Sequence, residues 1–296
     1  MISVGKNREQ IREETDVIKI ISYIVMTLFG LMCLFPFYYI FVVSISAPQF
    51  VREGQIILWP KGFSLQAYKV TFNHARFYSS FRISVIRTLI GTALGVTLSS
   101  SLAYAVSRKY LRGRKFFMVF IVFTMLFNGG IIPTYLVVRY TGLIDSIWAL
   151  IIPNMINTFN VIVLVNFFKG IPDEIEESAK IDGANDLIIF YKLMIPVAMP
   201  AIATITLFIS VYHWNSLMDG ILYINTPSKK PLQVYLNDIV AAGQTDDLFG
   251  DASARWMPTL SLKTATIFAS TLPILMVYPF LQKYFVKGIM VGSVKG

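Results

Sequence analysis

The sequence predicts an all-α polytopic membrane protein: six transmembrane helices and, between the fourth and fifth, one large cytoplasmic loop. The 296-residue chain is 55% hydrophobic and only 15% charged, whereas soluble domains carry about 25% charged residues. Its mean hydropathy is +0.62. Apolar stretches long enough to cross a bilayer core of about 30 Å recur along the whole chain. These observations favour one membrane domain over a soluble fold.

The expected spans cover about 17–44, 82–107, 116–138, 146–168, 198–224 and 260–286. They leave a tail at 1–16, a transmembrane domain at 17–286, a tail at 287–296 and a polar loop at about 169–197. Lys and Arg are more numerous in the two tails and in the 108–115 and 169–192 loops than in the loops opposite. Cytoplasmic loops carry such an excess, so both termini are expected in the cytoplasm of a multi-pass membrane protein.

Most of the net charge of +9 is therefore explained by topology, and lipid rather than nucleic acid is the expected surrounding partner. The chain has one cysteine, Cys33, and two histidines, His74 and His213, so it has few of the side chains that thiol or metal chemistry requires. No Gly-x-x-x-x-Gly-Lys-[Ser/Thr] phosphate loop occurs, so the chain is not expected to bind ATP itself. Neither a cofactor nor an enzymatic activity is expected in this chain.

The second and third spans carry polar and glycine residues that an ordinary lipid-facing helix would avoid. A charge as deep as Arg87 is expected to face an aqueous cavity or a buried partner. Gly91 and Gly95 suit close contact between helices. In the third span, the run Asn128-Gly129-Gly130 and Pro133, before Tyr135, predicts a break in its external half.

The fourth and fifth spans carry amides and aromatic rings. Asn154, Asn157 and Asn160 recur every three residues, which on a regular helix keeps them within about 120° of one face. Such amides either form hydrogen bonds between helices or line a hydrophilic path. The block Tyr212-His213-Trp214-Asn215 could contact a sugar through rings and amide, although an interfacial aromatic belt explains Tyr212 and Trp214 almost as well.

The polar loop predicts two short helices. Pro172 suits the start of the first, with acidic residues at the positive end of its dipole. Gly183 can end it in a left-handed cap, and Asn185 or Asp186 can cap the second. Pro196 disfavours helix at Ile195 and marks the expected end. The acidic residues are expected on solvated faces, so the loop is either a solvated linker or a docking element.

The spacing within this loop favours docking. Glu177-Ser178-Ala179, three residues, Gly183, nine residues, Leu193, one residue and Ile195-Pro196 resembles the EAA loop of bacterial ABC importer permeases. Ser178 and Ile195 are mild departures from Ala and Leu. Asp182-Gly183-Ala184 resembles the sugar-importer branch, and the block 282–296 resembles the C-terminus of that family. The block 128–135 resembles its oligosaccharide and polyuronide importers.

The resemblance implies a permease subunit in the bacterial inner membrane, fed by an external solute-binding protein. Its expected partners are a homologous second permease and two ATP-binding cassette ATPase subunits, which hold the ATP and Mg. The substrate would be an oligosaccharide, acidic if Arg87 faces the path. A membrane scaffold or enzyme subunit, or an importer of a non-sugar solute such as a peptide, are the alternatives.

The resemblance also assigns residues. The expected ATPase-coupling residues are Glu177, Ser178, Ala179, Asp182, Gly183, Ala184 and Pro196. The candidate translocation path comes instead from the polar and aromatic residues within the spans: Arg87, Asn128, Tyr135, Asn154, Asn157, Asn160, Tyr212, Trp214 and Asn215.

Overall fold

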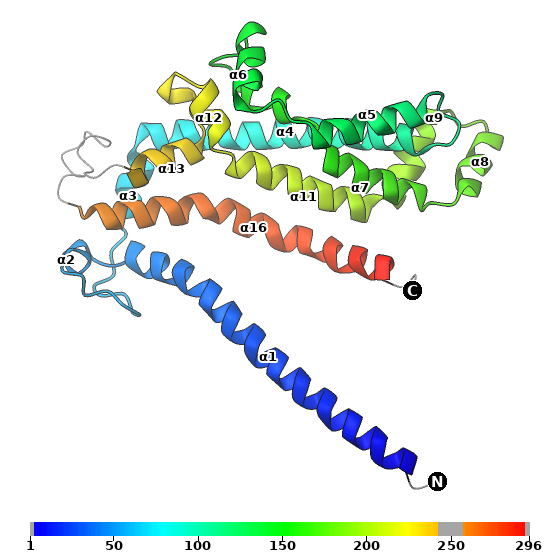
Figure 1. The fold of residues 1–296 in the computed structure, drawn as a ribbon. Helices are drawn as coiled ribbons and strands as arrows, with labels where there is room; N and C mark the ends of the chain where they lie inside the picture. The colour runs from blue at the N-terminus through cyan, green and yellow to red at the C-terminus, as the bar shows by residue number, and fades with distance from the viewer. Residues whose placement is uncertain (1–2, 242–256, 294–296) are drawn as a thin grey trace. The chain divides into compact units, whose positions relative to one another are not determined.

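The computed structural model describes residues 3–241 and 257–293, which are helices joined by turns (Figure 1). Within this described part, an isolated antiparallel bridge joins Ser46 and Phe63. The chain forms two compact units, Met1–Thr71 with Gln244–Ala269, and Phe72–Gly243 with Ser270–Gly296. The last three residues of the predicted C-terminal tail, 294–296, lie outside the described residues.

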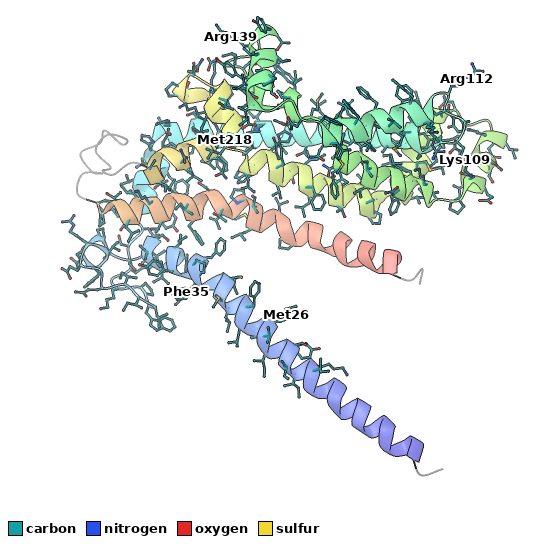
Figure 2. The ribbon with its side chains drawn as sticks, viewed as in Figure 1. Met26, Phe35, Lys109, Arg112, Arg139 and Met218 are labelled. Carbon is teal, nitrogen blue, oxygen red and sulfur yellow. The ribbon has the colours of Figure 1, made fainter. Side chains whose placement is uncertain are left out.

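The first unit contains helix α1 (Ser3–Ser44), which runs through the predicted tail and first span with Pro36 inside it. No break separates that tail from the span. Met26 and Phe35 project from α1 (Figure 2) and are 71% and 50% exposed, as a lipid-facing helix requires. The short helices α2 (Pro48–Arg52) and α3 (Gln66–Asn73) follow, and the last long helix is α16 (Thr259–Ser293).

The second unit is built along helix α4 (Ala75–Ser107). Helices α7 (Thr158–Lys169) and α11 (Met199–Asn215) pack along it (Figure 1). Glycines make this approach close. A Cβ added at Gly95 would lie 3.0 Å from the carbonyl oxygen of Met155, and one at Gly91 would lie 2.7 Å from Cδ2 of His213. The prediction that these glycines serve close helix contact is confirmed.

Three helical stretches are continuous, apolar and long enough to cross a membrane, namely Ile18–Ser44, Ala75–Ser107 and Thr259–Val277. Three further pairs of helices pass the same test but are bent, so the described residues hold up to six spans. One bent pair is α5 (Arg114–Leu126) with α6 (Ile131–Tyr140), at 113°. The break falls at the predicted Asn128-Gly129-Gly130, where Gly130 has a φ of 84°.

The second bent pair corrects the expectation of one regular helix through the three asparagines. Short 3₁₀ turns, η1 (Ile147–Leu150) and η2 (Ile152–Asn154), precede α7 at an angle of 49°. Asn154 ends η2, Asn157 caps α7 and Asn160 lies in its first turn. Pro153 and the capping side chain of Asn157 favour an interruption here.

The expected fifth span is also divided. Helix α11 ends at Asn215, and helices α12 (Met218–Tyr223) and α13 (Leu232–Ala241) follow, with a 3₁₀ turn, η4 (Pro227–Lys229), between them. In Figure 1, α6, α12 and α13 lie toward one end of α4, whereas α8 (Asp173–Ile181) and α9 (Asp186–Ile188) of the polar loop lie at the other. The two ends of the second unit therefore carry different structures.

The polar loop forms helix α8 (Asp173–Ile181), a turn with Gly183 at a φ of 82°, and a second helical segment. Asn185 caps that segment, since its side chain accepts a hydrogen bond from the backbone N–H of Ile188 at 2.9 Å. These expectations are confirmed.

The predicted end of the second segment is wrong. Helix α9 (Asp186–Ile188), a π-helix (Ile189–Met194) and α10 (Ile195–Val197) run on through Pro196 to an 84° bend before α11. The wider π turn before Pro196 relieves the clash between its ring and the preceding turn, so helix persists at Ile195.

Candidate functional site: a polar cavity and a two-helix loop

A cavity of about 660 Å³ lies in the second unit. Its walls come from the end of α5, the interrupted segment before α7, the first turn of α7 and the middle of α11. Five of the predicted path residues line it: Asn128, Asn154, Asn157, Asn160 and Tyr212. The break before α7 is what brings the three asparagines of that segment to one wall. Such a lining offers amide donors and acceptors and one aromatic ring.

A second cavity, of about 280 Å³, shares Asn128, Asn154 and Tyr212 with the first. It is bounded by α6 and α12 and adds Thr134 and Asp219. Some amide atoms in these walls serve the backbone: Asn128 Oδ1 accepts from Gly130 N at 2.8 Å. The side-chain nitrogen of Asn128 takes no part in this hydrogen bond, so it can donate to the hydroxyl groups of a ligand.

Arg87 does not line either cavity. Its side chain is fully buried and pairs with Asp219 of α12, with Nη1 donating to Oδ1 at 3.2 Å. The sequence predicts that Arg87 faces either an aqueous cavity or a buried partner, and the structure shows the buried partner. Burying a guanidinium without a carboxylate would cost several kcal/mol, and the pair carries no net charge.

The remaining path candidates do not line either of these two cavities. Tyr135 stacks on Tyr223 with ring centroids 6.3 Å apart. Trp214 is buried on another side of α11, edge-on to Phe81. Asn215 is exposed and accepts from Gln233 at 3.4 Å. Sequence reasoning missed Asp219. It is an acid near the end of an apolar span that contains no Lys or Arg, and this pattern indicates a pair with a cation from another helix.

The loop residues assigned to coupling are mostly accessible. Glu177, Ser178, Asp182, Gly183 and Pro196 are exposed, whereas Ala179 and Ala184 are half-buried and pack against the core. Apolar side chains beside them also face outward: Ile181 is 86% exposed and Leu187 is 69% exposed. The small residues Ala179 and Ala184 thus pack the loop against the protein, and its outer face presents Glu177 and Asp182 beside apolar groups.

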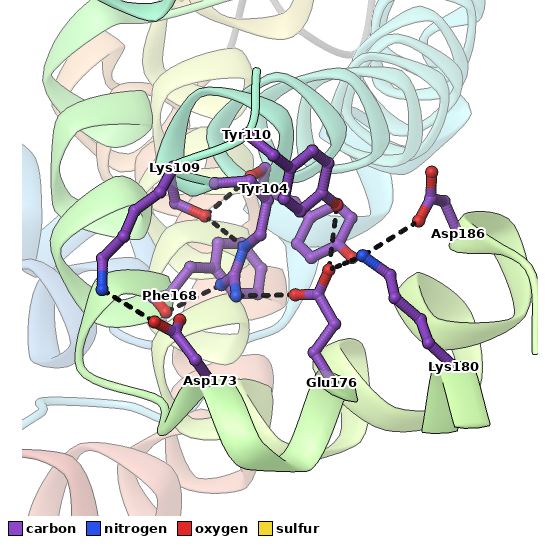
Figure 3. Close-up of polar contacts among 10 residues, drawn as sticks. Tyr104, Lys109, Tyr110, Phe168, Asp173, Glu176, Lys180 and Asp186 are labelled. Carbon is purple, nitrogen blue, oxygen red and sulfur yellow. Dashed lines mark hydrogen bonds and ion pairs between the residues drawn. The ribbon is translucent and has the colours of Figure 1, made fainter. Parts of the chain in front are cut away.

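Glu176 is the exception to the expected solvated acids, because it is only 4% exposed. Three side chains donate to its carboxylate (Figure 3): Arg108 Nη1 at 2.8 Å, Tyr110 Oη at 2.9 Å and Lys180 Nζ at 2.9 Å. Arg108 also donates to the carbonyl oxygen of Phe168 at the end of α7, at 2.9 Å. One cluster therefore joins α4, α7 and α8.

The pKa values of this cluster follow from its contacts. Burial raises the pKa of the Glu176 carboxyl, but the hydrogen bonds from Lys180 and Tyr110 and the charge of Arg108 outweigh it, leaving the pKa lowered. Burial, followed by the hydrogen bond to Glu176, raises the pKa of Tyr110 to about 12. The signals in the sequence were Lys180, four residues after Glu176, and Arg108 at the end of the second span.

At the opposite end of α4, Asp145 joins two connecting segments. It has a φ of 62°. Its carboxylate accepts from the backbone N–H of Asn225 and Thr226, the hydroxyl of Thr226 and the amine of Lys229, at 2.7–3.1 Å. The hydrogen bond from Lys229 and then those from Thr226 hold the pKa of Asp145 far below its usual range.

Comparison with known proteins assigns the chain to a family. No family model matches it. It is 48% identical over 273 residues to the polygalacturonan/rhamnogalacturonan transport system permease protein YtcP of Bacillus subtilis (strain 168), covering 92% of this chain and 96% of that protein. This chain belongs to the permease subunits of ABC sugar importers. Protein LplC of the same organism is 41% identical over 268 residues, covering 90% and 91%.

A solved ABC sugar-importer structure agrees with the sequence relatives. The crystal structure of a bacterial ABC transporter involved in the import of the acidic polysaccharide alginate contains a chain 34% identical to this permease, with a TM-score of 0.86, covering 91% of this chain and 97% of that one. ABC sugar permeases are transport subunits, so the enzyme and scaffold alternatives are set aside. In general such permeases work with ATPase subunits, a binding protein and a second permease.

Proposed function

We propose that this chain forms half of the translocation path of an ATP-driven, binding-protein-dependent importer of oligosaccharides, with the 169–197 loop as its coupling element. The observation that carries the proposal is the separation of two structures on one helix. Two helices that wall the amide-lined cavity, α7 and α11, pack along α4, and the accessible two-helix loop lies at one end of α4 (Figure 1). ATP-driven closure of an ATPase pair docked on that loop would turn the cavity from the cytoplasm to the outside.

The proposal also places the molecule in the bacterial inner membrane with six spans and both termini in the cytoplasm. Two of the bent pairs, α5 with α6 and η1–η2 with α7, then count as one span each, and α11 is the membrane-crossing part of the third pair. The charged loop at 169–197 would lie on the cytoplasmic side with the ATPase subunits, which would bind the ATP and Mg. Asp145 and the segment after α12 would lie outside, near the solute-binding protein. Charged Asp173, Glu174 and Glu177 fit water rather than hydrocarbon.

The substrate class is inferred from the cavity and the relatives. Amides and Tyr212 suit sugar hydroxyls and sugar faces. The neighbouring alginate importer favours an acidic oligosaccharide. The described walls of both cavities contain Asp219 but no Lys or Arg, and Arg87 is neutralised by Asp219. The second permease would therefore supply the cations for an acidic sugar. A peptide remains the non-sugar alternative, and uptake of labelled oligogalacturonides against labelled peptides separates the two.

The coupling assignment is tested with Glu177→Lys and Gly183→Asp in the assembled transporter. Both changes lie on the exposed face. A Cβ at Gly183 would meet no heavy atom within 4 Å, but the φ of 82° strains any residue other than glycine, so Glu177→Lys is the more specific of the two tests. We expect normal membrane insertion and at least a tenfold fall in uptake, the size of a moderate coupling free energy. Glu174→Gln, on the same helix, is the matched control. Normal uptake by both variants with normal ATPase association would contradict the assignment.

A further inference from the structure

The cytoplasmic end of α4 contacts both helical segments of the polar loop. Arg108, the cap of α4, donates to Glu176 of α8 and to the carbonyl of Phe168 in α7. The Tyr104 ring lies 5.1 Å from that of Phe190 in the π-helix and 5.8 Å from that of Phe168. Arg108 lies over Tyr104, with Cζ 5.0 Å from its centroid. Both helical segments of the loop are thus anchored on two consecutive turns of α4.

This anchor is a buried ionic contact rather than a surface one. The side chains of Arg108 and Glu176 are each 5% exposed. Removing one partner of such a pair leaves an uncompensated charge. The neighbouring pair of Lys109 and Asp173 is largely exposed, at 80% and 53%, and such pairs contribute little. Arg108 and Glu176 are therefore the ionic contact that fixes where α8 sits on α4.

The two helices that Arg108 joins to α8, namely α4 and α7, also reach the cavity or the residues that line it. On α4, Gly95 packs against Ile209 of α11 and the backbone of Met155, and both of these residues line the cavity. On α7, Phe168 lies at the C-terminal end, whereas Asn160, which lines the cavity, lies in the first turn. A displacement of α8 carried by Arg108 would therefore move two walls of the cavity together.

We propose that Arg108 and Glu176 are positioning residues that lock α8 to α4 and α7, so that movement of the loop becomes movement of the cavity walls. The inference rests on the proposed function and deepens it. Glu177 faces the partner, whereas Glu176, one residue earlier, faces inward. The two adjacent glutamates thus have different roles, since the outer one meets the ATPase and the inner one transmits the displacement.

The test uses the complete importer complex in vesicles, with Cys33→Ser and a reporter cysteine at Phe159, a cavity residue that is 51% exposed. The rate at which a thiol reagent labels this cysteine is measured with and without ATP plus vanadate, alongside ATP hydrolysis. In the parent complex we expect ATP to change the labelling rate about tenfold. In Glu176→Gln we expect continued ATP hydrolysis and a change of less than about twofold.

Three further variants make the outcome specific. Glu174→Gln removes the same charge from an exposed site on α8 and is expected to respond as the parent. Arg108→Lys keeps the charge but cannot reach Glu176 and the Phe168 carbonyl together, so we expect an intermediate response. The exchange of Arg108→Glu with Glu176→Arg is expected to restore part of the response, which would show that the pairing of the two side chains, and not either residue alone, is required.

The outcomes separate the two proposals. If the labelling rate of the parent complex does not change with ATP, the proposed function is overturned. A normal parent with equally normal Glu176→Gln and Arg108→Lys complexes would overturn the positioning role alone. If Glu176→Gln fails to assemble, the decision rests on Arg108→Lys: a response equal to that of the parent overturns the role, and a reduced response supports it.

Discussion

The pair of Arg87 and Asp219 shows how one side chain changes the meaning of another. Alone, an arginine at this depth suggests a binding site for an anion. Paired with Asp219 inside the second unit, its charge is compensated and the guanidinium is withdrawn from the cavities. The carboxylate, not the guanidinium, reaches a cavity wall. The charge that a substrate would meet here is therefore set by α12.

At this scale we predict that Asp219→Asn lowers the free energy of unfolding by about 3–5 kcal/mol, because Arg87 keeps a buried charge without its partner. Replacing both residues, as Arg87→Met with Asp219→Leu, should cost less than the single change. Asp238→Asn is the control, since its pair with Arg76 is partly exposed, at 29% and 25%, and we expect about 0–1 kcal/mol. Thermal unfolding in detergent measures all three. Equal losses for the single and double variants would contradict the buried-pair argument.

At the scale of elements, local signals predicted local structure. Gly183 ends α8 with a positive φ and Asn185 caps the next segment, because both effects depend on a few neighbouring residues. The glycines at 129 and 130 mark the break of the third stretch for the same reason. The two-helix loop and one of the bends could therefore be placed from sequence alone.

Other features depend on distant partners and were not predictable. Glu176 differs locally from the exposed acids around it only by Lys180 four residues later, and its burial follows from Arg108 and Tyr110, more than sixty residues earlier. The helix through Pro196 follows from a π turn that no short motif indicates. Five of the nine path candidates share a cavity, since spacing identifies polar residues in apolar segments but not the wall that each one joins.

Asp145 gives a prediction about the connection between elements. Because its pKa is lowered in the folded state, its contribution to stability is present above the unfolded value of about 3.9. It is lost only as pH falls through the lower folded value. Hydrogen exchange at the Asn225 and Thr226 amides, corrected for intrinsic rates, should therefore show constant protection from pH 7 to pH 5.

Asp145→Asn should lower that protection about tenfold throughout this range, the size of a lost hydrogen bond to a charged group. Asp173→Asn, at the other end of α4, should leave these amides unchanged. Loss of protection in the unaltered protein between pH 7 and pH 5 would show that another group holds the segment.

At the scale of the molecule, the two ends of α4 should lie on opposite sides of the membrane. Helix α4 has 33 residues and is therefore about 50 Å long, more than the roughly 30 Å hydrocarbon core. Figure 2 shows Lys109 and Arg112 at the end that carries α8, and Arg139 and Met218 at the other. The density of cations and acids around α8 favours the cytoplasmic side for it.

This arrangement predicts the labelling of two new cysteines in a Cys33→Ser background. Tyr140 and Ile181 are 85% and 86% exposed, so accessibility within the second unit is matched and only sidedness differs. In intact cells, a membrane-impermeant thiol reagent should label Tyr140→Cys at least tenfold faster than Ile181→Cys, because an intact bilayer excludes the charged reagent. After permeabilisation, and with the ATPase subunits that would cover Ile181 removed, the two rates should become similar. The Cys33→Ser parent should remain unlabelled, and equal labelling of both cysteines in intact cells would place both ends on one side and refute the six-span topology.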